Sequence, residues 1–278
     1  MPKTKVCAVQ SLVHPSFERN LAKAEQFFRK ASRLNCNIIC FPEIFLTGPL
    51  NKQEYNPKIP ILSKKIFSKL TKNYGMFAVM GSIKEKINGN FYNVSYLFDD
   101  KGKILGNYKK NHLQSNSEAL YVKADTKVSV FKTKIGNIGI EICKDLLFPE
   151  VTRRLLLKGA EIVFCPSFWC SYSEVYSPIY NKKYFKNKKP VEVVTFVPAR
   201  AIESEVFFVY ANAAGTSKSS HGKDVLLGKT QIAMPFYGTT DILDHNKEGM
   251  LVKELDLSII RDAKKVYKVE QDAKRYYK

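Results

Sequence analysis

Three reactive side chains each follow a strand-like segment of the sequence: the carboxylate of Glu43, the ammonium of Lys110 and the thiol of Cys143. Cys143 lies in GIEICKDLLFPE, where an alternating strand pattern stops before a helix-opening Pro-Glu. Its neighbours are charged, whereas a buried structural thiol would have apolar ones. Taken singly, Glu43 and Lys110 would each be ordinary surface charges. Together with a thiol they supply a proton acceptor and a cation that stabilises negative charge, which predicts nucleophilic catalysis.

The alternation around Cys143 predicts where its side chain points. In Ile138-Gly-Ile-Glu-Ile-Cys143, the three isoleucines fall on one face of the strand, and Glu141 and Cys143 fall on the other. A strand–turn–helix junction exposes a side chain at the edge of a sheet and presents backbone N–H groups to a developing oxyanion. We therefore expect Cys143 at such a junction, with the N–H of Lys144 among the oxyanion donors.

The segments around these residues alternate between helical and strand-like patterns, which predicts one α/β domain without internal repeats. The pattern predicts helices over residues 16–35, 61–73, 149–158 and 198–205, and a polar loop over 215–224. It predicts strands over residues 5–10, 37–41, 77–84, 91–98, 103–109, 127–133, 137–143, 161–165, 206–212, 228–234 and 250–257. Because three of these strands end beside the reactive residues, we expect the three side chains within roughly 8 Å of one another.

The formal charge of +19 over 278 residues raises the question of nucleic-acid binding. The charge is spread along the chain, and its densest run, residues 181–189, is typical of a solvated loop. We therefore do not expect nucleic acid as a partner. No run approaches the twenty or so apolar residues of a membrane span, and the N-terminal residues lack a signal-peptide apolar region, so we expect a soluble, cytoplasmic protein.

The six cysteines are Cys7, Cys36, Cys40, Cys143, Cys165 and Cys170. They form no CxxC pair and share no spacing with the four histidines, which argues against a zinc site. Those at 7, 40 and 165 lie in apolar, strand-like runs, as free thiols do in a reducing compartment. We expect only Cys143 to combine exposure with a nearby ammonium.

Three motifs of this sequence resemble the Glu, Lys and Cys motifs of the nitrilase superfamily of carbon–nitrogen hydrolases. They are FPEIFLTG around Glu43, YKKNHL around Lys110 and GIEICKDLLFPE around Cys143. Further segments resemble runs of that family: KGAEIVFCPS followed by Trp169, then ARAIES, Ala211-Asn212 and the closing ELDL. The resemblance extends from Val6 to about Arg261.

The resemblance implies a role for each motif residue: Cys143 as nucleophile, Glu43 as general base and Lys110 as stabiliser of the tetrahedral intermediate. Glu118, in SEALY, matches the second glutamate of such sites, with a solvated glutamate as the alternative. The implied fold is a single-domain α-β-β-α sandwich over residues 1–264, followed by a basic C-terminal tail over 265–278. Members of this family pair through their outer helices, so the resemblance also implies a homodimer or higher homo-oligomer.

Several positions near the implied acyl pocket depart from the family pattern. Lys144 stands where an aromatic residue is common, Thr230 stands where serine is common, and residues 172–194 are rich in Tyr, Lys and Pro. We expect Lys144, Trp169 and Tyr172 to contact the substrate. Because these positions differ from the family, the identity of the substrate stays open.

The expected reaction is hydrolysis of a non-peptide carbon–nitrogen bond in a small amide or carbamoyl compound, through a thioester at Cys143. Lys110 and the backbone dipoles of the turn would favour the thiolate over an ordinary thiol of pKa about 8.5. This chemistry requires neither a metal nor an organic cofactor. A nitrile hydrolase, an acyl transferase and a catalytically silent basic binding protein are the alternatives. The presence of all three motif residues disfavours the last of them.

Overall fold

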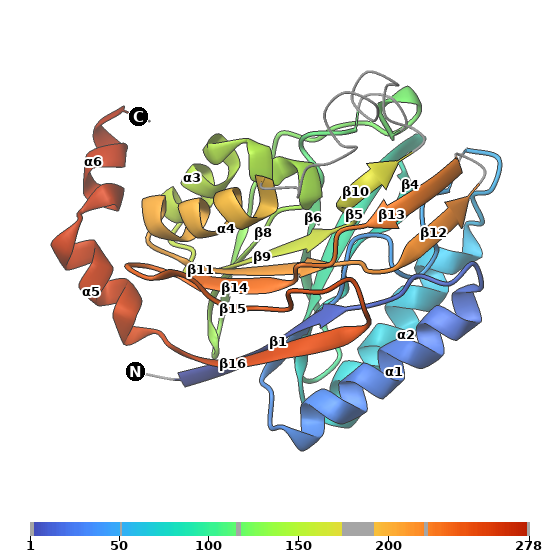
Figure 1. Cartoon of the computed structure of the whole chain (residues 1–278), viewed down its shortest axis with the longest axis horizontal. Helices are drawn as coiled ribbons and strands as arrows, with labels where there is room; N and C mark the ends of the chain where they lie inside the picture. The colour runs from blue at the N-terminus through green and yellow to red at the C-terminus, as the bar shows by residue number, and fades with distance from the viewer. Residues whose placement is uncertain (1–2, 51, 115–117, 174–191, 220–221, 277–278) are drawn as a thin grey trace.

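Two β-sheets lie face to face, and a pair of helices covers the outer face of each (Figure 1). The computed structural model describes residues 3–50, 52–114, 118–173, 192–219 and 222–276. Within this part of the chain the layers run helix, sheet, sheet, helix. The fold is therefore the single-domain α-β-β-α sandwich that the sequence predicted.

The first sheet contains the first and the last strand of the chain. Its strands are β1 (Lys3–Gln10), β2 (Ile38–Cys40), β3 (Phe77–Val79), β4 (Ile83–Ile87), β5 (Asn90–Phe98), β6 (Ile104–Lys109) and β16 (Gly249–Asp256). Their order is β16-β1-β2-β3-β5-β4, and β6 pairs with β5. β1 is parallel to β2 and antiparallel to β16, so the first and last strands are neighbours.

The second sheet carries the strand that leads to Cys143. It consists of β7 (Val130–Thr133), β8 (Gly136–Ile140), β9 (Ile162–Ser167), β11 (Phe207–Asn212), β14 (Gln231–Met234) and β15 (Gly238–Ile242), in the order β15-β14-β11-β9-β8-β7. A smaller sheet consists of β10 (Cys170–Ser173), β13 (Gly222–Leu226) and β12 (Thr216–Ser219). β8, β9 and β11 are parallel, so their carboxyl ends lie at one edge.

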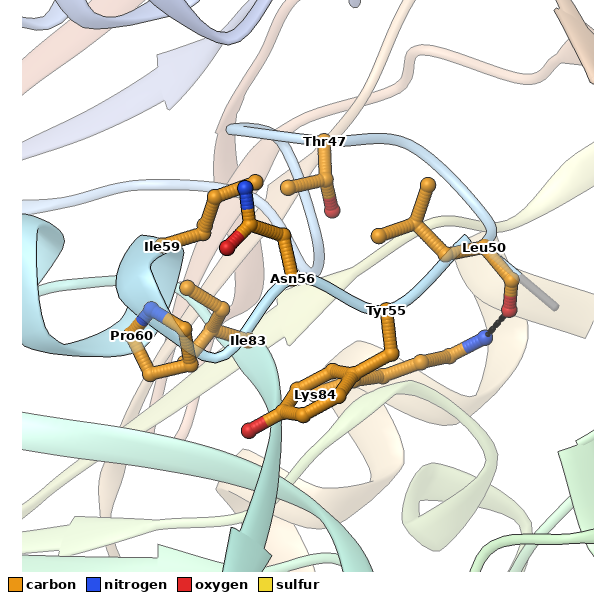
Figure 2. Close-up of a pocket in the computed structure, with 8 residues that line it drawn as sticks. All are labelled: Thr47, Leu50, Tyr55, Asn56, Ile59, Pro60, Ile83 and Lys84. Atoms are coloured by element: carbon orange, nitrogen blue, oxygen red, sulfur yellow. Dashed lines mark hydrogen bonds between the residues drawn. The ribbon is translucent and has the colours of Figure 1, made fainter. Parts of the chain in front are cut away.

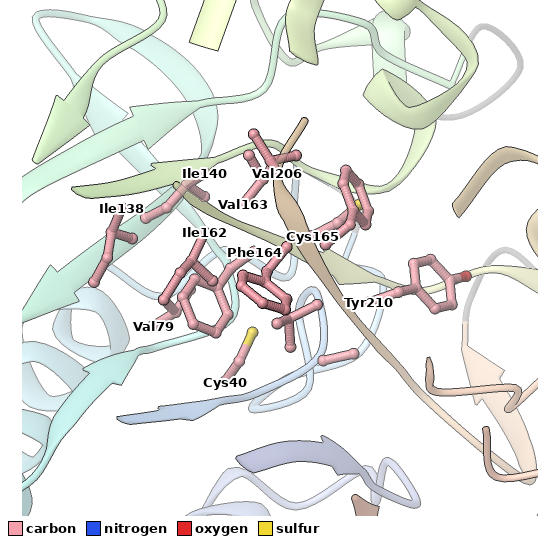
Figure 3. Packing of buried hydrophobic residues seen from close by; sticks show 14 of the residues in the cluster. Cys40, Val79, Ile138, Ile140, Ile162, Val163, Phe164, Cys165, Val206 and Tyr210 are labelled. Carbon is pink, nitrogen blue, oxygen red and sulfur yellow. The ribbon is translucent and has the colours of Figure 1, made fainter. Parts of the chain in front are cut away.

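The core between the two large sheets is apolar. Figure 3 shows Cys40 of β2 and Val79 of β3 facing Ile162 and Phe164 of β9. All four side chains are fully buried, and alternation along β9 turns Val163 to the opposite face of the sheet. Because β2 and β9 are buried on both faces, they read as nearly continuous apolar runs in the sequence.

Helices α1 (Phe17–Arg33) and α2 (Lys58–Tyr74) cover the first sheet. Ser16 caps α1, because its hydroxyl accepts a hydrogen bond from the N–H of Arg19. α2 ends at Gly75, whose φ of 60° lies in the left-handed region that glycine adopts readily. Phe28 of α1 and Phe67 of α2 meet edge-on over the sheet, 5.7 Å apart.

Helices α3 (Pro149–Leu157) and α4 (Glu192–Glu203) cover the second sheet. The chain then continues past β16 into α5 (Ser258–Val266) and α6 (Val269–Tyr276). Residues 265–266 and 269–276 of the predicted tail thus belong to these helices, and Ala273 of α6 is buried. In the described part of the chain, no helix combines the length and the apolar character needed to cross a bilayer.

The structure differs from the sequence prediction at several elements. The predicted strand 77–84 is two strands, β3 and β4, because the chain turns at Gly81, where φ is +79° and a Cβ would lie 2.2 Å from the carbonyl oxygen of Pro42. The predicted loop 215–224 instead contains β12 and most of β13. Four further elements were not predicted: β10, β15, α5 and α6. Helix α4 begins at Glu192, six residues before the predicted start, and includes Pro198.

Candidate active site

Glu43, Lys110 and Glu118 form one buried cluster between the two sheets. Nζ of Lys110 lies 2.7 Å from Oε1 of Glu43 and 2.9 Å from Oε2 of Glu118. The three side chains come from the turn after β2, the end of β6 and the short helix η1 (Glu118–Leu120). Each residue is less than a tenth exposed. Lys110 therefore lies between Glu43 and Glu118 and contacts both carboxylates.

Backbone contacts fix the position of each of these side chains. The N–H of Lys110 donates to the carbonyl of Asn93 on β5, at 2.9 Å. The N–H of Glu43 donates to the carbonyl of Ser167 at the end of β9, at 3.3 Å. Because Ser167 belongs to the second sheet, this bond joins the Glu43 turn to the sheet that carries Cys143.

Asn93 of β5 links the two glutamates, although the sequence analysis did not single it out. Its Nδ2 donates to Oε1 of Glu43 at 2.8 Å and to Oε1 of Glu118 at 2.7 Å. The alternation of β5 places Asn93 on the same face as Ser95. Two polar residues on one face of a buried strand are the sequence signal that could have identified Asn93. Asn93 therefore holds both carboxylates at a fixed separation.

The charges of this cluster reinforce one another. Burial alone lowers the pKa of Lys110, but the Glu118 and Glu43 carboxylates outweigh it and raise the pKa well above the ordinary value. Burial raises the pKa of Glu118, and the Lys110 ammonium and the Asn93 amide outweigh it and hold the pKa below its usual range. Lys110 is therefore a cation and Glu118 an anion at neutral pH.

Cys143 lies at a strand–turn–helix junction, as predicted. β8 ends at Ile140, and the short helix η2 (Cys143–Leu147) then leads into α3. Cys143 has a φ of 49°, a left-handed conformation that costs a non-glycine residue on the order of 1 kcal/mol. Glu141, on the same face of the predicted strand, instead lies behind the turn, where its Oε2 accepts from the hydroxyl of Thr152 on α3.

The Cys143 thiol faces the Glu43 carboxylate and the backbone N–H of Phe168. Burial and the negative charge of Glu43 raise its pKa well above the ordinary value, although Lys110 lowers it. Burial and Glu43 thus outweigh the shift toward the thiolate that we expected from Lys110 and the turn. Lys110 acts in the expected direction, but its charge is already paired with two carboxylates. The resting thiol carries its proton, and Glu43 is beside it to accept that proton.

A second network fixes the cysteine turn against the lysine motif. Oδ2 of Asp145 accepts from the hydroxyl of Tyr108 at 2.7 Å and from the N–H of Ile142 at 3.0 Å. Oδ1 of Asp145 accepts from His112, whose ring stacks on Phe148 with centroids 3.5 Å apart. Tyr108 and His112 flank Lys110 in the sequence, so this network sets the position of η2 relative to Lys110.

The three residues expected to contact the substrate have different surroundings. Nζ of Lys144 donates to the carbonyl of Leu113 at 2.8 Å, which directs this side chain to the loop after Lys110. Trp169 is partly buried, and its backbone N–H donates to the Asn212 side chain at 2.8 Å. Tyr172 lies on β10 and is 38% exposed. Residues 174–191, most of the Tyr-rich loop, lie outside the described residues.

Thr230, where a serine was expected from the family pattern, supports Asn212 from the other side. Its Oγ1 accepts from the N–H of Asn212 at 3.0 Å. The Asn212 side chain in turn donates to the carbonyl of Gly228 at 2.8 Å. Thr230 thus acts on the Trp169 segment through Asn212. Among the residues with described placement, no group of three or more His, Cys, Asp or Glu could hold a metal ion.

Comparison with known proteins identifies the family. The model of the carbon–nitrogen hydrolase family matches residues 5–265. The chain belongs to the carbon–nitrogen hydrolase family. This membership confirms the resemblance of the three motifs and makes the chain an enzyme of carbon–nitrogen bond hydrolysis.

Three relatives of this carbon–nitrogen hydrolase are distant in sequence but match over nearly their full length. An omega-amidase of Xenopus laevis is 26% identical, and the alignment covers 99% of this chain and 96% of the relative. An N-carbamoylputrescine amidase of Arabidopsis thaliana is 27% identical, with 96% and 91% covered. The crystal structure of a carbon–nitrogen hydrolase from Helicobacter pylori G27 superposes with a TM-score of 0.86 at 20% identity, covering 97% and 94%. That likeness supports the fold assignment.

Proposed function

We propose that this chain hydrolyses a small amide or carbamoyl compound through a thioester at Cys143. The observation that carries the proposal is the buried cluster in which Lys110 bridges Glu43 and Glu118 while Glu43 faces the Cys143 thiol. A neutral thiol next to a carboxylate suits a reaction in which the proton leaves during attack rather than before it.

The first half of the reaction forms the thioester. Glu43 takes the proton from Sγ of Cys143 as the sulfur attacks the carbonyl carbon of the amide. The Lys110 ammonium and the backbone N–H of Lys144 stabilise the oxyanion, each donor contributing a few kcal/mol. The carbon–nitrogen bond then breaks while Glu43 returns the proton to the departing nitrogen, which leaves as ammonia or an amine.

The second half hydrolyses the thioester. Water attacks the acyl carbon and gives a proton to Glu43, and the same donors stabilise the second oxyanion. The carbon–sulfur bond then breaks, the carboxylic acid leaves, and Glu43 returns the proton to Sγ of Cys143. Glu118 keeps Lys110 charged and oriented through the cycle, since it accepts one of the ammonium hydrogen bonds.

The choice of substrate class rests on burial and on the relatives. Glu43 and Lys110 are each 3% exposed, which favours a compact substrate over a peptide chain. The two curated relatives described above are, by their names, amidases of an omega-amide and of a carbamoyl amine.

We place Trp169, Tyr172 and Lys144 at the substrate end of the site. Of these, Trp169 has the clearest support, because it follows Phe168, whose N–H donates to Oε2 of Glu43 at 3.0 Å.

A screen for ammonia release tests this proposal. Wild-type protein and Cys143→Ala are incubated with linear amides, dicarboxylic acid monoamides, carbamoyl amines and nitriles. We expect ammonia from at least one amide or carbamoyl compound with the wild type and none with Cys143→Ala. Addition of hydroxylamine should yield a hydroxamate, because it intercepts a thioester. Hydrolysis that survives in Cys143→Ala, or turnover of nitriles alone, would contradict the proposal.

Assembly and location complete the proposal. The outer helix α4 exposes Val194 (37%) and Ile202 (41%), which supports a homo-oligomer joined through this layer. Light scattering after size exclusion should give at least twice the 31.7 kDa of one chain, and Ile202→Lys should lower this mass.

A cytoplasmic location is supported by the six free cysteines, and cell fractionation tests it.

A further inference from the structure

A second buried lysine lies in line with the catalytic cluster. In the antiparallel pairing of β4 and β5, Lys84 lies directly opposite Asn93. On the other side of β5, the N–H of Lys110 bonds to the carbonyl of Asn93. One row thus crosses the sheet from Lys84 on β4 through Asn93 on β5 to Lys110, which directly follows β6. Since directly opposed residues share a face, Lys84 lies on the face from which Asn93 holds Glu43 and Glu118.

Lys84 contacts both chain segments that carry the carboxylates. Its ammonium donates to the carbonyl of Leu50, which follows Glu43 in the same loop, and Figure 2 shows this contact at the wall of a small pocket. It also donates to the hydroxyl of Tyr121 and lies 4.7 Å from the centre of that ring. Tyr121 belongs to the turn of Glu118, because its N–H donates to the Glu118 carbonyl at 3.2 Å.

A count of formal charges shows what Lys84 contributes. Glu43 and Glu118 carry two negative charges, and Lys110 supplies one positive charge, so this buried trio has an excess negative charge. Uncompensated charge is costly in a buried site, and the usual outcome is that one carboxylate binds a proton. Lys84 is 8% exposed and is the cation that would balance the trio.

The remaining groups around Lys84 agree with this balance. Within the described residues, the Lys84 ammonium has two hydrogen-bond acceptors. Both are neutral oxygens, the Leu50 carbonyl and the Tyr121 hydroxyl. Burial lowers the pKa of Lys84 to about 8, while Glu118, Glu43 and the exposed Glu54 raise it and Lys110 lowers it. Below pH 8 Lys84 is therefore mainly an ammonium that acts on the carboxylates of the site.

We propose that Lys84 is a positioning residue for carbon–nitrogen hydrolysis, whose ammonium keeps Glu43 and Glu118 ionised together in mildly acidic solution. The inference rests on the proposed roles of these two glutamates. Without the Lys84 ammonium, one of the two carboxylates would bind a proton at higher pH than in the wild type. If Glu43 bound it, the base that receives the thiol proton would be lost. If Glu118 bound it, the negative charge that holds the Lys110 ammonium would be lost.

Three variants separate the charge of Lys84 from its hydrogen bonds. Lys84→Gln removes the charge and keeps N–H donors for Leu50 and Tyr121. Lys84→Arg keeps the charge. Lys86→Gln removes an exposed lysine of the same strand and serves as the matched control. If Lys84→Gln fails to fold, Lys84→Met fills the same volume with an apolar side chain and replaces it in each measurement.

The first measurement is the titration of the Glu43 and Glu118 carboxyl carbons by carbon-13 NMR in glutamate-labelled protein, which needs no substrate. Assignments come from Glu43→Gln and Glu118→Gln. We expect at least one midpoint to rise by half a pH unit or more in Lys84→Gln, about a threefold gain in proton affinity. Lys84→Arg and Lys86→Gln should titrate like the wild type.

The second measurement is the pH profile of kcat/KM for the best amide substrate. Its acidic limb should move to higher pH in Lys84→Gln by the same amount, with the rate near pH 8 changed much less. The inference would be overturned if the NMR midpoints and the acidic limb of Lys84→Gln matched those of the wild type. An equal shift in Lys86→Gln would overturn it as well. If the wild type hydrolyses no amide, the proposed function fails, and the NMR titration still decides whether Lys84 sets the charge of the two glutamates.

Discussion

Oδ1 of Asp145 accepts two hydrogen bonds from His112, one from the backbone N–H and one from ring nitrogen Nδ1, each 2.8 Å long. Because an ionised carboxylate only accepts, Nδ1 must carry the hydrogen. Asp145 follows Cys143 by two residues, and His112 follows Lys110 by two residues. The Asp145 carboxylate thus connects the turn of Cys143 to the loop after Lys110. Asp145 and His112 do not react themselves, but they fix the position of Cys143 relative to Lys110.

Asp145→Asn should therefore lower kcat more than it raises KM. The amide places a donor against the Tyr108 hydroxyl or against His112, so η2 shifts and Cys143 leaves its position next to Glu43. We expect a loss of about 10- to 100-fold in kcat and about 1–3 kcal/mol in the free energy of unfolding. Steady-state kinetics and urea unfolding measure both, with Asp262→Asn on exposed α5 as the control. Unchanged kcat in a folded variant would exclude this positioning role.

Glu141 should make the protein less stable as pH rises. Its side chain is fully buried, Oε1 has no hydrogen-bond partner in the described part of the chain, and burial raises its pKa from 4.5 to about 8. The folded state therefore binds a proton more tightly than the unfolded state, so stability falls as pH rises from about 4.5 to about 8. The expected total is on the order of a few kcal/mol.

Glu141→Gln should remove this pH dependence. We expect the variant to unfold at higher urea concentration than the wild type at pH 8 and to differ little at pH 5. Glu25→Gln, on the exposed face of α1, should follow the wild-type curve at both values. A wild-type midpoint that rises between pH 5 and pH 8 by more than that of Glu141→Gln would contradict the assignment of a buried neutral acid.

The sequence predicted those parts of the fold that depend on local pattern. The predicted helix over residues 16–35 matches α1, and the predicted strands over 91–98 and 103–109 match the β5–β6 hairpin. It failed where a distant contact decides the conformation. The break between β3 and β4 depends on the approach of the Pro42 carbonyl to Gly81, and these two residues lie in separate segments of the chain.

The same distinction applies to the candidate site. Motifs located Glu43, Lys110, Glu118 and Cys143, because each motif is a continuous run of residues. Asn93 and Lys84 belong to strands without a recognised motif, and their importance depends on pairing across β4, β5 and β6. The protonated state of the Cys143 thiol also depends on burial, which the charged residues around it in the sequence do not reveal.

Trp169 should determine substrate preference. It is partly buried beside the Phe168 N–H that contacts Glu43, so a smaller residue would enlarge the acyl end of the site. We expect Trp169→Ala to change the ratio of kcat/KM between a short and a long amide by about tenfold or more, since each methylene contact contributes 1–3 kcal/mol. Phe236→Ala, at an exposed turn, is the control. An unchanged ranking of substrates would show that Trp169 does not line the acyl site.

Thiol alkylation distinguishes Cys143 from the other cysteines by its pH dependence. All six are buried, with Cys143 (9%) and Cys36 (7%) the most exposed. A hydrogen bond from Cys7 and the charge of Lys5 lower the pKa of Cys36, whereas burial and Glu43 raise that of Cys143. The expectation that only Cys143 combines exposure with a nearby ammonium therefore changes, because Lys5 acts on Cys36 and Cys36 should also be modified near neutral pH.

Mass spectrometry after timed exposure to iodoacetamide checks this order. Cys36 and Cys143 should be modified before the other four cysteines, and only modification of Cys143 should remove activity, so Cys36→Ser should leave the inactivation rate unchanged. Because the thiolate is the reacting species, the Cys143 rate should rise about tenfold per pH unit between pH 7 and 9, and the Cys36 rate should rise less.

Lys110→Met removes the charge that lowers the pKa of Cys143, so it should slow modification of Cys143 several-fold and leave Cys36 unaffected. Equal rates at Cys143 in Lys110→Met and wild type, or inactivation that tracks Cys36, would show that the Lys110 charge does not act on the nucleophile as the structure indicates.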